Sequence, residues 1–187
     1  VLVAFSGTLF YNVVIKPENF MSTLSEETPD IIFVTKAADL EQLTDDLRTD
    51  ADVQSVLNYT TANVNLGSSA VTAFVCEDFS RTTNDLCYLG RNPQEKGGIA
   101  LGSAFEAQYN IGDAVTIESG DKTCTYQVTG FIQSVNYQGA VCGLTTEGYE
   151  ALCGEIALPS LYVYLKEGAS AEAVISRYEN EHAELLI

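Results

Sequence analysis

The segment Gly90–Phe131 constrains the fold of this chain more than any other, because short elements of different type follow one another with few residues between them. An apolar run after Gly98 is typical of a buried strand, and later segments alternate apolar and polar residues as half-buried strands do. The predicted order is a strand over 99–101, a helix over 103–109, a Gly-Asp turn at 112–113, and strands over 114–118 and 123–132. This order predicts a compact β-rich module with no catalytic apparatus inside it.

The flanking segments add both helices and strands. Leu40, Leu43 and Leu47 recur at the spacing of one helical face, so a helix is predicted over 37–50. Another helix is predicted to start after Thr145, because the threonine hydroxyl can accept a hydrogen bond from a free amide of the first turn. The remaining predictions are strands over 30–35, 53–64, 70–77, 140–144 and 161–165, helices through 152 and over 168–186, a loop over 63–69, and a polar, turn-rich segment over 81–96.

Residues 1–15 carry no charge and are mostly apolar, and Leu2, Phe5 and Leu9 fall on one face of a helix. The stretch is shorter than the ~20 apolar residues that cross a bilayer. It also lacks the basic start and the cleavage site of a signal peptide. It is therefore either an amphipathic packing helix or the outer end of a membrane helix whose inner part is missing.

The charge of the chain excludes two classes of partner. The formal net charge is −17, and such a surface repels both nucleic acid and anionic lipid. Two interpretations of the acidity stay open. It provides a solvated, soluble exterior, or it attracts a cationic ligand such as a basic peptide.

The five cysteines also allow more than one interpretation. Their spacing is too wide for a usual zinc site, and an odd number leaves at least one thiol free or intermolecular. Cys76 with Cys87, and Cys142 with Cys153, are the closest pairs, and either could form a disulfide in an oxidising compartment. The alternative is a set of buried free thiols.

Motifs for catalysis, metals and cofactors are absent from the sequence. A hydrolase needs a nucleophile, a base and an orienting group, and the one histidine, His182, lies on a polar helix near the C-terminus. Four aspartates within 45–52 lack the glycine and the closing glutamate of a calcium loop, which favours a solvated helix end. The glycines at 97, 98 and 102 match no phosphate-binding loop, so no cofactor is predicted and any ATP hydrolysis belongs to another polypeptide.

The ordered motifs resemble the extracytoplasmic (MacB-like periplasmic core) domain of FtsX/MacB-type ABC transporter permeases. In that family a Gly-Arg-x-Pro segment precedes an apolar run, a helix, a Gly-Asp turn with its strand, and a strand of the pattern Tyr/Phe-x-Val-x-Gly-Ile/Phe. The resemblance covers most of the chain from about residue 28 onward, and it implies structural roles for the matching positions. These positions are Gly90, Arg91, Pro93, Leu101, Gly112, Asp113, Val115, Tyr126, Val128 and Gly130.

The resemblance implies an α+β fold with two lobes. An α/β porter-like lobe is expected from the N- and C-terminal parts, with an inserted β-rich, sabre-like lobe. The expected boundaries are a membrane-proximal helix over 1–20, a discontinuous porter-like lobe over 21–80 and 155–187, and an inserted lobe over 81–154. Insertion between two membrane helices implies that both chain ends point toward the membrane.

The function that the resemblance implies is not enzymatic. Family members couple ATP hydrolysis in the cytoplasm to movement of such domains on the extracytoplasmic face of the bacterial cytoplasmic membrane. The chain is then a fragment of an integral membrane protein that handles substrate or transmits conformational change. The implied partners are a cytoplasmic ABC ATPase reached through the membrane helices, a second permease copy or paralogue, and a peptide, lipoprotein or cell-wall hydrolase.

Two other classes of function stay open. One is a surface-anchored acidic module that binds a cationic peptide or another ligand. The other is a carboxylate-dependent hydrolase, which needs two acids that converge in a cleft. Because the chain has no tryptophan, a sugar-binding cleft would depend on tyrosine for stacking.

Overall fold

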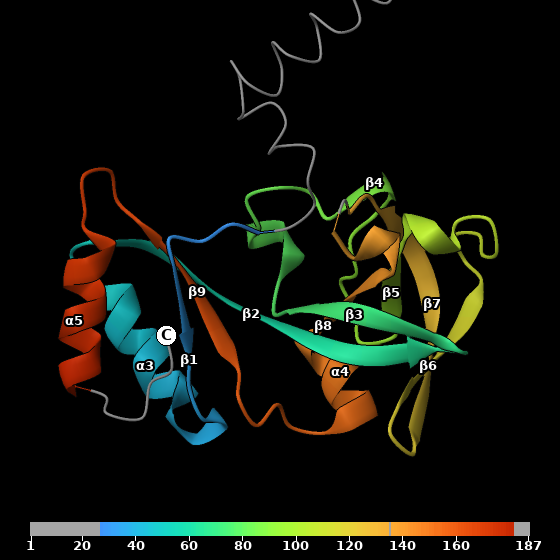
Figure 1. Cartoon of the computed structure of the whole chain (residues 1–187), viewed down its shortest axis with the longest axis horizontal. Coiled ribbons are helices and arrows are strands. Elements are labelled where there is room, and N and C mark those ends of the chain that lie inside the picture. Colours follow the sequence, from blue (N-terminus) through green and yellow to red (C-terminus); the bar gives the residue numbers. More distant parts are fainter. Residues whose placement is uncertain (1–26, 135, 182–187) are drawn as a thin grey trace, which may run out of the picture.

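The described part of the chain, residues 27–134 and 136–181 of a computed structural model, is organised around a nine-stranded mixed sheet (Figure 1). The strand order is β1-β9-β2-β3-β8-β5-β7-β4, and β6 pairs with both β2 and β7. The β3–β8 and β5–β7 pairs are parallel, whereas the other pairs are antiparallel. The strands are β1 (Ile31–Val34), β2 (Val53–Leu66), β3 (Ser69–Cys76), β4 (Cys87–Gly90), β5 (Gly98–Gly102), β6 (Ala114–Ser119), β7 (Lys122–Ile132), β8 (Val141–Thr145) and β9 (Ser160–Leu165).

Helices and short 3-10 turns complete the described part. Together with the sheet they give the α+β class that the sequence predicts. The helices are α3 (Leu40–Thr49), α4 (Thr146–Cys153) and α5 (Ala171–Glu181), and the 3-10 turns are η2 (Ala37–Asp39), η3 (Phe79–Arg81), η4 (Ser103–Phe105) and η5 (Asn136–Gly139).

Three predictions concern residues outside the described ranges. They are the membrane-proximal helix over 1–20, the end of the last helix over 182–186, and the position of His182. Among the described residues, no helix combines the length and the apolar character that a membrane span requires.

The first hydrophobic core lies where α3 and α5 pack against β1, β9 and the start of β2 (Figure 1). Leu43 and Leu47, whose spacing predicts α3, are both buried in this core. Val174 and Tyr178 of α5 enter the same core, and the Tyr178 ring centroid lies 5.7 Å from that of Phe33 in β1. Each large apolar side chain buried in this way contributes about 1.5–3 kcal/mol to folding.

The second core fills the space between α4 and strands β2, β3, β5, β6, β7 and β8. The helix α4 begins where its capping residue predicts, because Thr145 Oγ1 accepts a hydrogen bond from Gly148 N at 3.1 Å. Leu152 of α4 packs into the core, and Tyr126 Oη donates to Gly148 O at 2.8 Å. The buried polar end of this tyrosine is therefore satisfied, and α4 is held against β7.

Strand β2 takes part in both cores. Val56 lies in the first core and Val64 in the second. Between them, Tyr59 belongs to a third apolar cluster, where its ring centroid lies 4.8 Å from that of Tyr162 in β9. One continuous strand thus connects the two ends of the molecule through the aromatic cluster (Figure 1).

The predicted helix over 103–109 is wrong, because only the 3-10 turn η4 forms there. Glu106 N donates to Ser103 O and Gln108 N donates to Phe105 O, so these bonds close short turns and not a sustained helix. Phe105 is buried while residues 106–108 are exposed. A segment with one buried anchor has no apolar face to hold two helical turns against the core.

The predicted loop over 63–69 is also wrong. Strands β2 and β3 continue in register as far as Leu66 and Ser69, which leaves a two-residue hairpin turn. Gly67 has φ +57°, a conformation that glycine adopts without steric cost.

The segment over 81–96, predicted as a polar, turn-rich stretch, contains the edge strand β4. Leu89 pairs with Phe131 and Gly90 with Gly130 of β7, and a bulge precedes Leu89. The strand covers only Cys87–Gly90, which is too short for an alternating pattern to be recognised.

Replacement of Gly102 by alanine tests the packing at the end of β5. An added Cβ would lie 2.0 Å from the carbonyl oxygen of Gly139, which is a backbone atom that cannot move aside cheaply. We expect Gly102→Ala to lower the free energy of unfolding by about 1–3 kcal/mol in urea titrations. Gly97→Ala is the matched control, because a Cβ there meets no atom within 4 Å and should change stability by less than about 0.5 kcal/mol. Equal effects of the two substitutions would contradict this packing.

Candidate functional site

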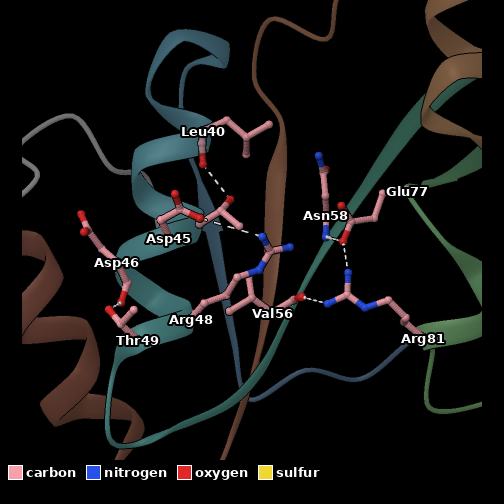
Figure 2. A network of polar contacts seen from close by, with 10 residues as sticks. Leu40, Asp45, Asp46, Arg48, Thr49, Val56, Asn58, Glu77 and Arg81 are labelled. Atoms are coloured by element: carbon pink, nitrogen blue, oxygen red, sulfur yellow. Dashed lines mark hydrogen bonds and ion pairs between the residues drawn. The ribbon is translucent and has the colours of Figure 1, made fainter.

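A polar groove lies between α3 and the centre of the sheet, close to the place where the two cores meet (Figure 2). Its cavity has a volume of about 290 Å³. Residues from η2, α3, β2 and the end of β3 line it, and these elements carry both acidic and basic side chains into the groove. The lining residues are Ala37, Leu40, Glu41, Thr44, Asp45, Arg48, Asn58 and Glu77, which we call the α3 groove.

The helix α3 supplies one wall of the α3 groove. Its apolar face is buried in the first core, so its polar face points away from that core. Thr44 Oγ1 donates to Leu40 O at 2.7 Å, which satisfies the hydroxyl within the helix. Arg48 Nη1 lies 4.0 Å from Asp45 Oδ1, and both side chains are exposed. The Arg48 guanidinium is thus held only loosely by its acidic neighbour.

The opposite wall is held by a tighter network around Arg81 of η3. Arg81 Nη1 donates to Glu77 Oε1 at 2.5 Å, and Nη2 donates to Val56 O of β2 at 2.7 Å. Figure 2 shows the Arg48 and Arg81 guanidinium groups reaching toward β2 from opposite sides. Next to Arg81, hydrogen bonds from Ser80 to the Asp78 carboxylate lower the pKa of Asp78. The carboxylate thereby caps η3 in its ionised form.

A second, smaller cavity of about 80 Å³ adjoins the α3 groove and shares Ala37, Leu40 and Asn58 with it. It extends toward α4, where Thr146 and Glu150 line it. Thr146 Oγ1 is buried and has no hydrogen-bond partner in the described part of the chain. The two cavities together form a polar seam that runs from α3 to α4.

The aspartates within 45–52 do not form the simple solvated helix end that the sequence favours. The Asp50 side chain is only 4% exposed and lies 3.4 Å from Arg177 Nη1 of α5. Asp52 Oδ2 accepts from Arg177 Nη2 at 2.7 Å. Burial, together with the neighbouring Asp50 carboxylate, raises the pKa of Tyr178. These contacts tie α5 to the connection between α3 and β2.

A second polar corner surrounds Arg91, which lines two cavities of about 180 and 450 Å³. Arg91 N donates to Thr129 O at 3.0 Å, so the backbone at this residue is fixed against β7. Its side chain is exposed and forms no ion pair with the residues that the structure describes. Neighbouring Pro93 is buried and lines the larger cavity.

The structure brings two of the motif glycines together. Gly90 pairs with Gly130, and a Cβ on Gly90 would lie 2.5 Å from Thr129 O. A Cβ on Gly130 would lie 2.6 Å from Leu89 O. Side chains at either position would therefore push β4 away from β7, and Gly90 in addition has φ +83°.

The Gly-Asp turn and the apolar motif residues have structural contacts. Gly112 N donates to Val128 O at 2.8 Å, and Val128 N donates to Asp113 O at 2.9 Å. Asp113 Oδ2 accepts from Asn110 N at 2.7 Å, which closes the turn. The apolar motif residues Leu101, Val115, Tyr126 and Val128 are all buried in the second core.

All five cysteines are free in the structure, so neither of the two pairs that the sequence allows is joined. Cys76 and Cys142 are buried, whereas Cys87, Cys124 and Cys153 are half-buried. Burial raises the pKa of Cys76, Cys87 and Cys142 to about 12. These thiols are therefore not activated nucleophiles.

The polar side chains of the α3 groove are suited to contact with a ligand or a partner surface. No three acidic, cysteine or histidine side chains within 27–134 and 136–181 approach closely enough to hold a metal ion. The α3 groove offers hydrogen bonds and charges of both signs, which suit contact with a polar surface. Sequence reasoning missed this groove, although Glu77 and Arg81 stand four residues apart and carry opposite charges.

Arg81 and Arg48 provide a matched test of the groove. Arg81→Ala removes two short hydrogen bonds, one of them to a backbone carbonyl, and we expect a loss of about 1–2 kcal/mol in the free energy of unfolding. Arg48→Ala removes only a long, exposed ion pair and should cost less than about 0.5 kcal/mol. Urea titrations of both variants measure the difference. Similar values would show that the Arg81 network does not stabilise this wall.

Comparison with known proteins supports the fold. No protein-family model matches the chain, and no curated protein matches its sequence. The periplasmic region of MacB from Actinobacillus actinomycetemcomitans is 12% identical, with a TM-score of 0.52 over 83% of this chain and 86% of that one. The extracellular domain of the ABC-type transporter YknZ from Gram-positive bacteria is also 12% identical, with a TM-score of 0.52 over 81% of this chain and 86% of that one. The fold expected from the sequence motifs is thereby confirmed.

Proposed function

We propose that this chain, which has the fold of the MacB-like extracytoplasmic domain, is the non-catalytic extracytoplasmic part of an ABC transporter permease. The observation that carries the proposal is the likeness to the MacB and YknZ domains, which extends over more than four-fifths of the chain. In this role the domain handles substrate or transmits ATP-driven conformational change.

The proposal includes the two-lobe division. Residues 21–80 and 155–187 form the porter-like lobe in this scheme, and residues 81–154 form the inserted lobe. The first core draws its buried residues from 31–56 and 161–178, which supports a discontinuous lobe. The partners are a cytoplasmic ABC ATPase, reached through membrane helices, and a second permease copy or paralogue.

The continuity of β2 supports transmission of movement between the cores. The strand pairs with β9 through its first half and with β3 through its second half. A displacement of β9 and α5 is therefore carried into the second core along a hydrogen-bonded ladder. No flexible linker interrupts β2 between Val53 and Leu66.

The topology sets a requirement for insertion between membrane helices. β1 is antiparallel to β9, and α5 runs back opposite to β9, so β1 and α5 run in the same direction (Figure 1). The start of β1 and the end of α5 therefore lie at opposite edges of the first core. Insertion between two membrane helices requires both ends to approach one membrane, and the directions of β1 and α5 alone do not bring them there.

The alternative of an acidic module for cationic ligands has less support. Glu41, Asp45 and Glu77 line the α3 groove, but Arg48 lines it as well, and Arg81 binds Glu77 directly. The groove is therefore not a uniformly acidic surface. A cationic peptide would have to displace these arginines from their carboxylates.

An inserted epitope tests the location of the domain. The turn between β6 and β7, at Gly120 and Asp121, is exposed and tolerates an insertion between paired strands. In the full-length protein, we expect an antibody to label a tag at this turn on intact protoplasts. The same tag on the partner ATPase should be labelled only after permeabilisation. Labelling of the turn only in permeabilised cells would overturn the extracytoplasmic location.

Hydrogen exchange tests transmission through β2. Leu47 is fully buried in the first core, and Leu47→Ala should cost roughly 2–5 kcal/mol. If β2 makes the cores cooperative, we expect amide exchange to accelerate in β5 and β7 of the second core as well. Leu89→Ala, at a leucine that is 46% exposed, is the matched control and should leave exchange unchanged. Acceleration confined to the first core would contradict the coupling.

A further inference from the structure

The inner face of β7 is fixed against α4 by two side chains. Alternate residues of a strand share one face, so Lys122, Cys124 and Tyr126 point to the same side of β7. Tyr126 Oη donates to the carbonyl of Gly148 near the start of α4, at 2.8 Å. Lys122 Nζ donates to the carbonyl of Cys153 at the end of α4, at 3.0 Å. Cys124 lies between these two anchors and therefore faces the second half of α4.

The environment of Cys153 matches that of Cys124. Both side chains are half-buried and pack against the second core. Burial, followed by a hydrogen bond with the Cys124 thiol, raises the pKa of Tyr126, and Cys153 contributes to the same rise. Burial and a hydrogen bond with Cys153 likewise raise the pKa of Tyr149 to about 12. Both thiols and the Tyr126 side chain thus pack in the same apolar cluster.

The other three cysteines are placed differently. Cys76 and Cys87 belong to the third apolar cluster and not to the second core against which Cys124 and Cys153 pack. Cys142 also borders the second core, but it lies on the central strand β8, is fully buried, and pairs with Leu101 of β5. An oxidant in solution therefore reaches Cys124 and Cys153 more readily than Cys142.

We propose that Cys124 and Cys153 are a disulfide site that joins β7 to the C-terminal end of α4. In the reaction, the two thiols exchange with a small-molecule disulfide such as oxidised glutathione. One sulfur–sulfur bond forms in the protein, the glutathione disulfide is cleaved, and its two halves leave as thiols with the two protons. The oxidising compartment rests on the proposed extracytoplasmic function, whereas the pairing rests on the geometry of β7 and α4.

The bond is expected to fix α4, whose residue Leu152 is buried in the second core. Tyr126 and Lys122 already hold α4 at its two ends through single hydrogen bonds. A disulfide between Cys124 and Cys153 would add a covalent link to these hydrogen bonds. It would also constrain the chain between the two cysteines in the unfolded state. The oxidised protein should therefore melt roughly 5–10 °C above the reduced protein.

Peptide mapping of the full-length chain tests the pairing. The purified protein is incubated with oxidised glutathione, its remaining thiols are alkylated, and it is cleaved without reduction by trypsin and a glutamate-specific protease. We expect the fragment 151–155, which contains Cys153, to be joined to 123–147, and backbone fragmentation should locate the link at Cys124. A link from Cys153 to Cys142, or alkylation of all five thiols, would overturn the proposal.

Two variants sharpen the result. Cys142→Ala should retain the link between 151–155 and its partner fragment, whereas Cys124→Ala should remove it together with the redox-dependent melting shift. Retention of that shift in Cys124→Ala would contradict the proposal. If a variant fails to fold, peptide mapping of the unmutated chain still shows whether Cys124 is joined to Cys153. The epitope experiment on protoplasts tests the location separately, so failure of the location and failure of the pairing are distinguishable.

Discussion

Every hydrophobic cluster of the described chain contains residues of β2, and the arrangement of the two cores depends on this strand. Val56 faces the helices α3 and α5, Tyr59 packs in the aromatic cluster, and Val64 faces the β-rich end. A strand of 14 residues that is paired along its length resists bending, because any kink breaks ladder hydrogen bonds. The α3 groove and the polar seam toward α4 both lie beside its middle part, where Asn58 is found.

Much of the fold follows from local patterns in the sequence. The leucines of α3 recur with helical spacing, and Thr145 marks the start of α4, so both helices are recognised without knowledge of their partners. The edge strand β4 is different, because its four residues become a strand only through pairing with β7. The segment after Gly102 shows the opposite error: its composition allows a helix, but a single buried side chain, Phe105, leaves only a turn.

The candidate site could be predicted only in part. The sequence motifs single out Gly90 and Gly130, yet they lie on separate strands, and their close backbone approach depends on the β4–β7 register. The Glu77–Arg81 pair is visible as opposite charges four residues apart. Its second anchor, the carbonyl of Val56, comes from a strand distant in sequence, and only the packing of η3 against β2 reveals it. The sequence therefore predicts individual residues of the site, but not the contacts between elements that are distant in sequence.

The raised pKa of three thiols has a consequence for the redox chemistry of the chain. A thiol with a pKa of about 12, such as Cys76, Cys87 or Cys142, is ionised in only about one molecule in 10⁵ at pH 7. Because the thiolate is the species that attacks a disulfide, these three groups exchange very slowly. An odd number of cysteines usually invites scrambled or intermolecular bonds. Here, the raised pKa values slow exchange at three of the five thiols, and the other two are those of the proposed disulfide site.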